Sequence, residues 1–332
     1  MAAAAVLALA ACGQSGDEEP RAATSSSAGS TTSAGGTTSL AGRPERGATT
    51  TTGADVRPAD SSTTSSRSDA DPAPDRPAGD TTAAATLRYE VVAAHWHDPS
   101  AFTQGLLYHD GTVFESTGIP GRSVLRAYRL DGLPPIDADA DAAPPAFTAD
   151  REVGADPAHF GEGLARVGDG LIWLTWRAGV ATRHDLRTLA AGPDPFRYDG
   201  EGWGLCHDGE RLVMSDGSAR LTFRNPADFA VLGSVDVVDV DGATPLRDLN
   251  ELECVDGVVW ANVWQTDRIV LIDPGTGAVV AEADMSGLIE PHPAVGDRDA
   301  VLNGIAFRPD TGTFLVTGKR WPTMFEVAFR AG

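Results

Sequence analysis

A polar residue, a glycine and an apolar residue recur along the chain, each time at the start of a short apolar strand. The copies are Gln104-Gly105-Leu106, Glu162-Gly163-Leu164, Glu201-Gly202-Trp203 and Asn303-Gly304-Ile305, with a degenerate copy at Asn250-Glu251-Leu252. After the later copies the strand runs into a Gly-containing turn and a returning apolar strand. Two such strands joined by an Asp-Gly type turn are typical of a β-hairpin.

The spacing of the copies leaves room for four short strands in each repeat. Four strands in roughly 40 to 50 residues is typical of a propeller blade. No segment with a helical period of useful length competes with this pattern. The five copies therefore predict an all-β fold, a five-bladed β-propeller. We also expect residues 87–94 to pair with residues 325–329 and close the ring, which would leave no open sheet edge.

Composition divides the chain of 332 residues into three parts. Residues 13–86 are almost all Ser, Thr, Ala, Gly, Pro and Asp, and such a stretch cannot bury enough apolar surface to offset its ordering entropy. We expect it to be a disordered tether. Apolar residues appear regularly from Leu87 onward, so residues 87–332 are predicted to form the propeller as one domain.

The first residues predict export. Residues 2–11 form an apolar run too short to span a bilayer, which takes about 20 residues. The run ends in Leu9-Ala10-Ala11-Cys12, which resembles the lipobox of a bacterial lipoprotein, so residues 1–12 are expected to be a signal peptide with Cys12 lipidated. No basic residue precedes Cys12, and we therefore expect the true start to lie upstream. The alternative is an ordinary signal peptide with a chance cysteine, but the long tether that follows favours a lipid anchor in the cell envelope.

The formal charge of −21 argues against nucleic acid or anionic lipid as a partner, because both repel a negative surface. Membrane contact is therefore expected only through the lipid anchor, and we expect a monomer. Cys206 and Cys254 lie at nearly equivalent places in consecutive repeats. An envelope location permits a disulfide between them, the alternative being two buried free thiols.

A longer set of motifs follows the repeats in a fixed order. It includes Phe102-Thr103-Gln104-Gly105-Leu106, Phe160-Gly161-Glu162-Gly163-Leu164, Leu174-Thr175-Trp176, Leu249-Asn250-Glu251-Leu252-Glu253, Ala261-Asn262-Val263-Trp264 and Thr317-Gly318-Lys319-Arg320-Trp321-Pro322. The set resembles the plant and bacterial glutamine cyclotransferases across nearly the whole globular part. That family is a five-bladed propeller, in agreement with the repeat count. The resemblance implies an enzyme that converts the N-terminal glutamine of peptides and proteins to pyroglutamate with release of ammonia, without a cofactor.

The resemblance also assigns site residues. It places the acid–base carboxyl at Glu162 and the polar ligands at Gln104, Asn250 and Lys319. The aromatic wall of the substrate pocket would be formed by Phe102, Phe160, Trp176, Trp203 and Trp264.

These residue types suit the chemistry. One carboxyl can take a proton from the attacking amine and deliver it to the leaving nitrogen. Desolvation by Trp and Phe raises a carboxyl pKa towards neutrality, as the dual role of Glu162 requires. Lys319 and the Asn250 amide are candidate donors to the tetrahedral oxyanion. The tryptophans would exclude water and hold the folded-back side chain.

Other polar residues are expected to be structural. The residues that open propeller repeats often satisfy backbone groups in the central channel, and we expect this role for Glu201 and Asn303. His95 and His97 lack a third metal ligand. Residues 137–141 alternate Asp like a calcium loop but lack its Gly and terminal Glu. We therefore predict no metal site, while leaving room for a structural divalent cation in the central channel.

Two other functions stay open from the sequence. A calcium-dependent, lactonase-like propeller hydrolase could use Glu162, Glu201, Asn250 and Asn303 as hard ligands, although Lys319 in the same site argues against a cation. A non-catalytic binding propeller of the envelope is the third possibility, and it leaves the Glu, Lys and Trp set unexplained.

Overall fold

The computed structural model describes residues 84–136, 146–288 and 298–332, all within one compact unit, Ala73–Gly332. In these ranges the fold is all-β, with twenty strands and one short 3-10 helix, Leu130–Gly132. None of the described helices is long and apolar enough to cross a membrane. The expected lipobox with Cys12, nearly all of the tether and the Asp-rich residues 137–141 lie outside the described residues.

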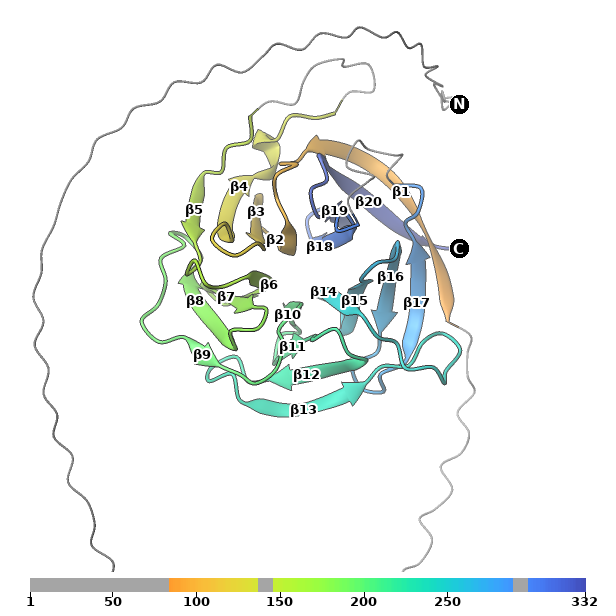
Figure 1. The fold of residues 1–332 in the computed structure, drawn as a ribbon. Coiled ribbons are helices and arrows are strands. Elements are labelled where there is room, and N and C mark those ends of the chain that lie inside the picture. Colours follow the sequence, from red (N-terminus) through yellow and green to blue (C-terminus); the bar gives the residue numbers. More distant parts are fainter. Residues whose placement is uncertain (1–83, 137–145, 289–297) are drawn as a thin grey trace, which may run out of the picture. The chain divides into compact units, whose positions relative to one another are not determined.

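Three sheets have four strands each, ordered along the chain from the centre outward (Figure 1). The first contains β2 (Thr103–His109), β3 (Thr112–Thr117), β4 (Val124–Arg129) and β5 (Arg151–Gly154). The second contains β6 (Gly161–Val167), β7 (Gly170–Thr175), β8 (Val180–Asp185) and β9 (Phe196–Arg197). The third contains β10 (Leu205–His207), β11 (Leu212–Met214), β12 (Arg220–Arg224) and β13 (Val231–Asp236).

The remaining strands form one eight-stranded sheet in the order β14-β15-β16-β17-β1-β20-β19-β18. Its strands are β14 (Leu249–Val255), β15 (Val258–Val263), β16 (Arg268–Ile272), β17 (Val279–Asp284), β18 (Leu302–Arg308), β19 (Thr313–Gly318), β20 (Thr323–Ala331) and β1 (Ala85–Trp96). Together the four sheets surround a central axis, with β2, β6, β10, β14 and β18 innermost (Figure 1). The all-β class predicted from the sequence is confirmed.

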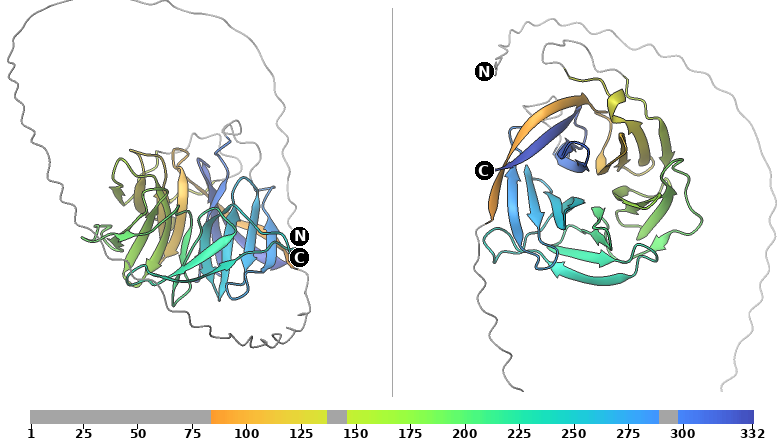
Figure 2. Two further views of the ribbon diagram at one scale, coloured as in Figure 1. Left: turned by 60° about the horizontal axis from the view of Figure 1, so that its bottom comes forward. Right: turned by 180° about the vertical axis from the view of Figure 1, so that it is seen from behind.

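The expected closure between the chain ends is confirmed. β1 pairs antiparallel with β20, from Leu87 opposite Ala331 to Trp96 opposite Thr323. Seen from behind in Figure 2, the orange β1 and the blue C-terminal strand lie side by side. β1 also pairs in parallel with β17, starting at Ala85 opposite Ala281, which the sequence did not predict.

Apolar side chains fill the space between neighbouring sheets. Leu107 and Phe114 of the first sheet meet Leu164, Leu171 and Trp173 of the second in one buried cluster. Fully burying a side chain of this kind stabilises a fold by about 1.5–3 kcal/mol. The clusters between the sheets therefore hold the inner strands in fixed places around the axis.

The repeated glycine allows adjacent inner strands to approach closely. A Cβ added at Gly105 would lie 2.7 Å from the backbone nitrogen of Leu164, and one at Gly163 would lie 2.6 Å from that of Leu205. Gly204 meets the backbone of Asn250 in the same way. Any larger residue would push neighbouring sheets apart, and this explains why the motif recurs.

The third repeat begins two residues later than the sequence predicted. β10 pairs Leu205 with Met214 as β6 pairs Leu164 with Trp173, so Trp203-Gly204-Leu205 occupies the repeat position rather than Glu201-Gly202-Trp203. The chain has glycines at both 202 and 204. A shift of two residues leaves side chains on the same face of a strand, so the apolar pattern could not separate the two phases.

A disulfide ties the third sheet to the eight-stranded sheet. It joins Cys206 on β10 to Cys254 on β14, with a Cα–Cα distance of 5.5 Å. This is the pairing that the sequence suggested.

Two carboxyls on β14, the buried Glu251 and the partly buried Glu253, bond to the backbone of other inner strands. Glu251 accepts backbone hydrogen bonds from Leu106 at 3.3 Å and Ile305 at 2.8 Å, so it links three inner strands. Glu253 accepts one from Phe307 at 3.0 Å. Burial raises the pKa of both carboxyls, that of Glu253 to about 8. The acid form of Glu253 therefore suits the folded state, and its ionisation opposes folding.

This raised pKa predicts a pH-dependent effect on stability. The contribution of Glu253 is fully present below its unfolded pKa of about 4.3 and is lost as pH rises through the folded pKa of about 8. Glu253→Gln keeps an acceptor for Phe307 but cannot ionise. Relative to the parent protein, the variant should gain stability as pH rises from about 5 to about 9, measured by urea unfolding. The exposed Glu210→Gln is the control, and equal pH dependence in parent and Glu253→Gln would refute the assignment.

Candidate active site

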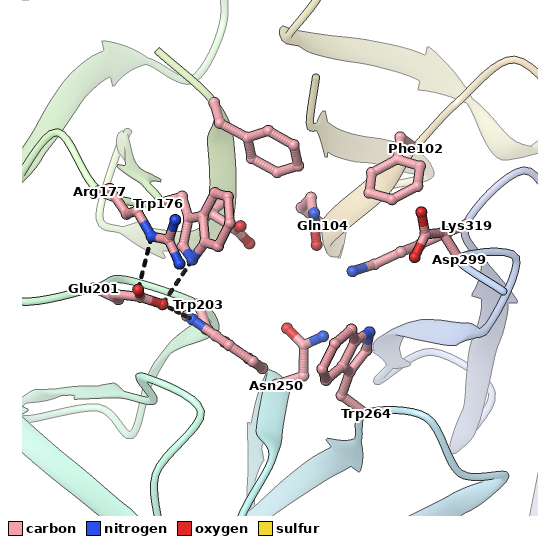
Figure 3. Close-up of a pocket in the computed structure, with 12 residues that line it drawn as sticks. Phe102, Gln104, Trp176, Arg177, Glu201, Trp203, Asn250, Trp264, Asp299 and Lys319 are labelled. Carbon is pink, nitrogen blue, oxygen red and sulfur yellow. Dashed lines mark hydrogen bonds and ion pairs between the residues drawn. The ribbon is translucent and has the colours of Figure 1, made fainter. Parts of the chain in front are cut away.

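A cavity of about 370 Å³ opens at one mouth of the ring (Figure 3). All nine side chains that the sequence assigned to substrate binding and catalysis line it: Phe102, Gln104, Phe160, Glu162, Trp176, Trp203, Asn250, Trp264 and Lys319. Arg177, Glu201 and Asp299 line it as well.

The polar groups come from the first residues of inner strands. Gln104 lies near the start of β2, Glu162 of β6 and Asn250 of β14. In each strand the register shifts at this point, between Thr103 and Gly105 in β2 and at the corresponding places in β6 and β14. A bulge re-aims a side chain relative to the pleat. The repeated bulge therefore accounts for the turning of these polar side chains into one cavity.

Two of the tryptophans and the lysine come from the ends of the second strands. Trp176 directly follows β7, Trp264 follows β15 and Lys319 follows β19. An antiparallel second strand ends where the inner strand begins, so both sets meet at one mouth. Trp203 arrives differently, because it precedes β10 at the repeat position that Glu162 occupies in β6.

Glu162 is held as a buried acid. The residue is 5% exposed, and its backbone carbonyl accepts a hydrogen bond from the Ser116 hydroxyl at 2.6 Å. Burial raises the pKa of its carboxyl well above the ordinary value, Lys319 partly opposes this, and the charge of Glu201 adds to it. A carboxyl whose pKa is raised in this way keeps its proton to higher pH than an ordinary one and is suited to donate it.

Lys319 is equally buried, at 5% exposure, and its Nζ lies 5.0 Å from the centre of the Phe102 ring. Burial lowers its pKa below the ordinary value, and the electrostatic influence of the Glu162 and Asp299 carboxyls opposes this only in part. The side chain therefore places its amino group beside the aromatic wall of the cavity.

The aromatic wall is continuous through ring contacts. Phe160 lies 6.1 Å from Phe102 and 5.6 Å from Trp176, measured between ring centres. Trp203 and Trp264 form a second, T-shaped pair at 5.6 Å. Rings in such contact present an apolar surface that excludes water from the polar groups between them.

Two asparagines differ in how their amides are satisfied. Asn303 donates from Nδ2 to the Thr103 carbonyl at 2.9 Å and to Gln104 Oε1 at 3.5 Å, so it satisfies backbone as expected and also orients Gln104. Asn250 is 2% exposed, and its Oδ1 is buried without a hydrogen-bond partner among the described residues. A buried unpaired acceptor at the cavity wall is suited to a ligand that brings a donor.

The bonding to channel backbone that we expected for Glu201 is wrong. Its carboxylate does not bond to channel backbone but accepts hydrogen bonds from the indole nitrogens of Trp176 and Trp203 and from Arg177. The error follows from the two-residue phase shift, which had placed Glu201 on an inner strand. Arg177 and Asp299 belong to no repeat position, so the sequence pattern carried no signal for them.

His97, one of the two histidines considered as metal ligands, belongs to a hydrogen-bond network instead. His97 bonds to Glu115 at 3.1 Å and to the Trp321 carbonyl at 2.7 Å, and Glu115 also pairs with Arg126 at 2.8 Å. The three side chains of this network are buried, and none of them lines the cavity. Within the described ranges, no three His, Cys, Asp or Glu side chains are grouped to hold a metal ion.

Comparison with known proteins gives a consistent result. The family described as glutamine cyclotransferase matches residues 62–329. A glutaminyl-peptide cyclotransferase of Arabidopsis thaliana is 37% identical over 246 residues, which are 73% of this chain and 71% of the relative. The crystal structure of Myxococcus xanthus glutaminyl cyclase is similar with a TM-score of 0.63 and 35% identity, covering 75% of this chain and 99% of that one. The chain belongs to the glutamine cyclotransferase family.

Proposed function

We propose that this protein is a glutaminyl-peptide cyclotransferase, which converts the N-terminal glutamine of peptides and proteins to pyroglutamate and releases ammonia. The observation that carries the proposal is a buried carboxyl with a raised pKa, Glu162, which shares an aromatic cavity with the buried Lys319. Family membership supports the same activity.

The reaction is an intramolecular aminolysis. The neutral α-amine attacks the γ-carboxamide carbon of its own residue, a carbon–nitrogen bond forms and the carbonyl oxygen gains negative charge. The amine nitrogen then loses a proton, the amide nitrogen gains one, the original carbon–nitrogen bond breaks and ammonia leaves. Because both reacting groups belong to one residue, the enzyme needs mainly to fold the side chain back and to move a proton.

Glu162 is the proposed proton carrier. A single carboxyl can give its proton to the leaving nitrogen and accept the one released by the amine. Lys319 and the Nδ2 group of Asn250 are the proposed donors to the oxyanion, since both line the same cavity as Glu162. The Asn250 Oδ1 can accept a hydrogen bond from an N–H of the substrate.

Substrate binding is assigned to the rest of the lining. We propose that Gln104 holds the γ-amide or the first peptide carbonyl. The five aromatic residues would surround the folded-back side chain and keep water from the reacting atoms.

We also propose that the ring is a five-bladed propeller. The eight-stranded sheet divides into two four-stranded units at the β1–β17 contact, which joins them by only three parallel residue pairs. With the three separate four-stranded sheets this makes five units, the number of sequence repeats. Residues 87–332 would be the catalytic domain.

The proposal is tested with a peptide that begins with glutamine. Mass spectrometry should show conversion to a product lighter by one ammonia, at a rate that a metal chelator does not change, because we propose that no cofactor takes part. An N-acetylated copy of the peptide cannot attack its own amide and should stay intact. A protein that leaves the free peptide unchanged would refute the activity, and chelator-sensitive turnover would favour the cation-dependent alternative.

We propose in addition that Cys12 becomes the lipidated N-terminus of an exported, envelope-bound enzyme, with residues 13–86 as its tether. The motif Leu9-Ala10-Ala11-Cys12 and the polar stretch after it support this. Cys12→Ser should move the protein from the membrane fraction to the soluble fraction and abolish labelling with palmitate in cells. Unchanged membrane binding and labelling would show that the anchor lies elsewhere.

A further inference from the structure

One carboxylate joins three side chains at the wall of the cavity. Glu201 Oε2 accepts a hydrogen bond from Nε1 of Trp176 at 2.7 Å and another from Nε1 of Trp203 at 3.0 Å. Its Oε1 accepts one from Nε of Arg177 at 2.8 Å. Figure 3 shows the three contacts together. Trp176 follows a strand of the second sheet and Trp203 precedes a strand of the third, so one oxygen connects the aromatic walls of two sheets.

Each indole is also packed on one face. That packing does not fix how the ring turns within its own plane. The guanidinium of Arg177 lies over the Trp176 ring at 3.7 Å. The Trp203 ring lies against Gly217, where an added Cβ would come within 2.7 Å of the ring atom Cε2. A ring fixed on one face can still slide or turn in its plane, and the bond from Nε1 removes that freedom.

The carboxylate itself is poorly suited to carry a proton. Burial would raise the pKa of Glu201, but hydrogen bonds from Trp203, Arg177 and Trp176 outweigh this and lower it. Both oxygens are already engaged by donors. The pKa values of the two carboxyls are therefore shifted in opposite directions, that of Glu201 down and that of Glu162 up.

We infer that Glu201 is a positioning residue: it holds the indoles of Trp176 and Trp203 in the orientation that closes the aromatic wall around the substrate's glutamine side chain. This inference rests on the proposed cyclase function. The inference extends that function, because it makes Glu201 a residue that maintains the shape of the pocket without reacting itself.

The contrast between two substitutions tests the inference. Glu201→Gln keeps an amide oxygen that can accept from both indoles, while its amide nitrogen faces the exposed Arg177, which can turn away. Glu201→Ala leaves both indole N–H groups unpaired. We expect kcat/KM for a Gln-initiated peptide to stay within about tenfold for Glu201→Gln and to fall by about 100-fold for Glu201→Ala, the scale of a misplacement near 1 Å. Equal losses in both variants would overturn the inference, because they would show that the charge of Glu201 matters rather than its bonds to the indoles.

A variant without the two indoles tests whether Glu201 acts through them or directly on the substrate. The double variant Trp176→Phe, Trp203→Phe removes both N–H donors. In that background Glu201→Ala should lower kcat/KM by less than about twofold, because interacting residues are not additive. A loss as large as in the parent enzyme would refute the inference.

Glu210→Ala is the control, since this exposed carboxyl lies outside the cavity lining and contacts neither indole. A surface substitution of this kind has little effect, so we expect kcat/KM to change by less than about twofold. Near-UV circular dichroism of each variant without substrate provides a readout that does not depend on turnover. Glu201→Ala should weaken the indole bands and Glu210→Ala should not. A parent enzyme that fails to cyclise the peptide would refute the proposed function alone, whereas unchanged indole bands in Glu201→Ala would refute the positioning role.

Discussion

Glu162→Gln should lower kcat for a Gln-initiated peptide by about 100- to 10,000-fold, the usual contribution of general acid–base catalysis. The amide keeps the shape and much of the hydrogen-bonding capacity of the carboxyl but cannot relay a proton. Substrate binding should change little, so the loss should fall on kcat rather than KM. Steady-state kinetics on the purified variant measures both.

The same assignment sets the pH dependence of the parent enzyme. Activity should rise with pH as the substrate amine, with a pKa of about 7.7 to 8.0, becomes neutral. It should fall again at higher pH as Glu162 loses its proton, because burial raises its pKa well above the ordinary range. The falling limb should be absent from the residual activity of Glu162→Gln. Near-normal turnover by that variant would overturn the role of Glu162.

Lys319→Ala should raise the reaction barrier by about 3 to 4 kcal/mol if the ammonium stabilises the oxyanion. Lys319→Met is the better-matched variant, because it keeps an apolar stem against Phe102 and removes only the charge. Both variants should lose rate to a similar extent in kcat/KM. A large loss for alanine with near-normal activity for methionine would mean that Lys319 acts through packing rather than charge.

Loss of the lysine charge should also be visible in the pH profile. Lys319 lowers the pKa of Glu162, opposing burial and the charge of Glu201. Without it the Glu162 acid form should persist to higher pH, and the falling limb should move upward. A falling limb that stays in place would show that the two groups do not interact.

Much of the site could be predicted from the sequence because its residues occupy fixed places in a repeat. Glu162, Asn250 and Gln104 each stand at the bulged start of an inner strand, and that place is marked by the recurring glycine or its equivalent. Lys319 was identified by family resemblance rather than by the repeat. The structure brings it into the same cavity as the others.

The features that could not be predicted depend on the exact start of a repeat or on contacts between different sheets. Glu201 was assigned to an inner strand because glycines at 202 and 204 allow two phases that present the same faces. Its bonds to Trp176 and Trp203 join two different sheets, and no periodic pattern reports such a contact. The parallel pairing of β1 with β17 was missed for the same reason, since it depends on where the closed ring places the two strands.

The central claim is that the pocket makes a glutamine side chain react with its own amine and not with water. The most direct test uses a peptide whose N-terminal glutamine carries ¹⁵N only in the γ-amide, incubated with the enzyme in H₂¹⁸O. All of the ¹⁵N should appear in the released ammonia, and the pyroglutamyl product should contain neither ¹⁵N nor ¹⁸O. An N-terminal glutamate bearing ¹⁸O would show that water attacks the amide, and a ring that keeps the ¹⁵N would show that the amide nitrogen is not the leaving group; either result would contradict the account.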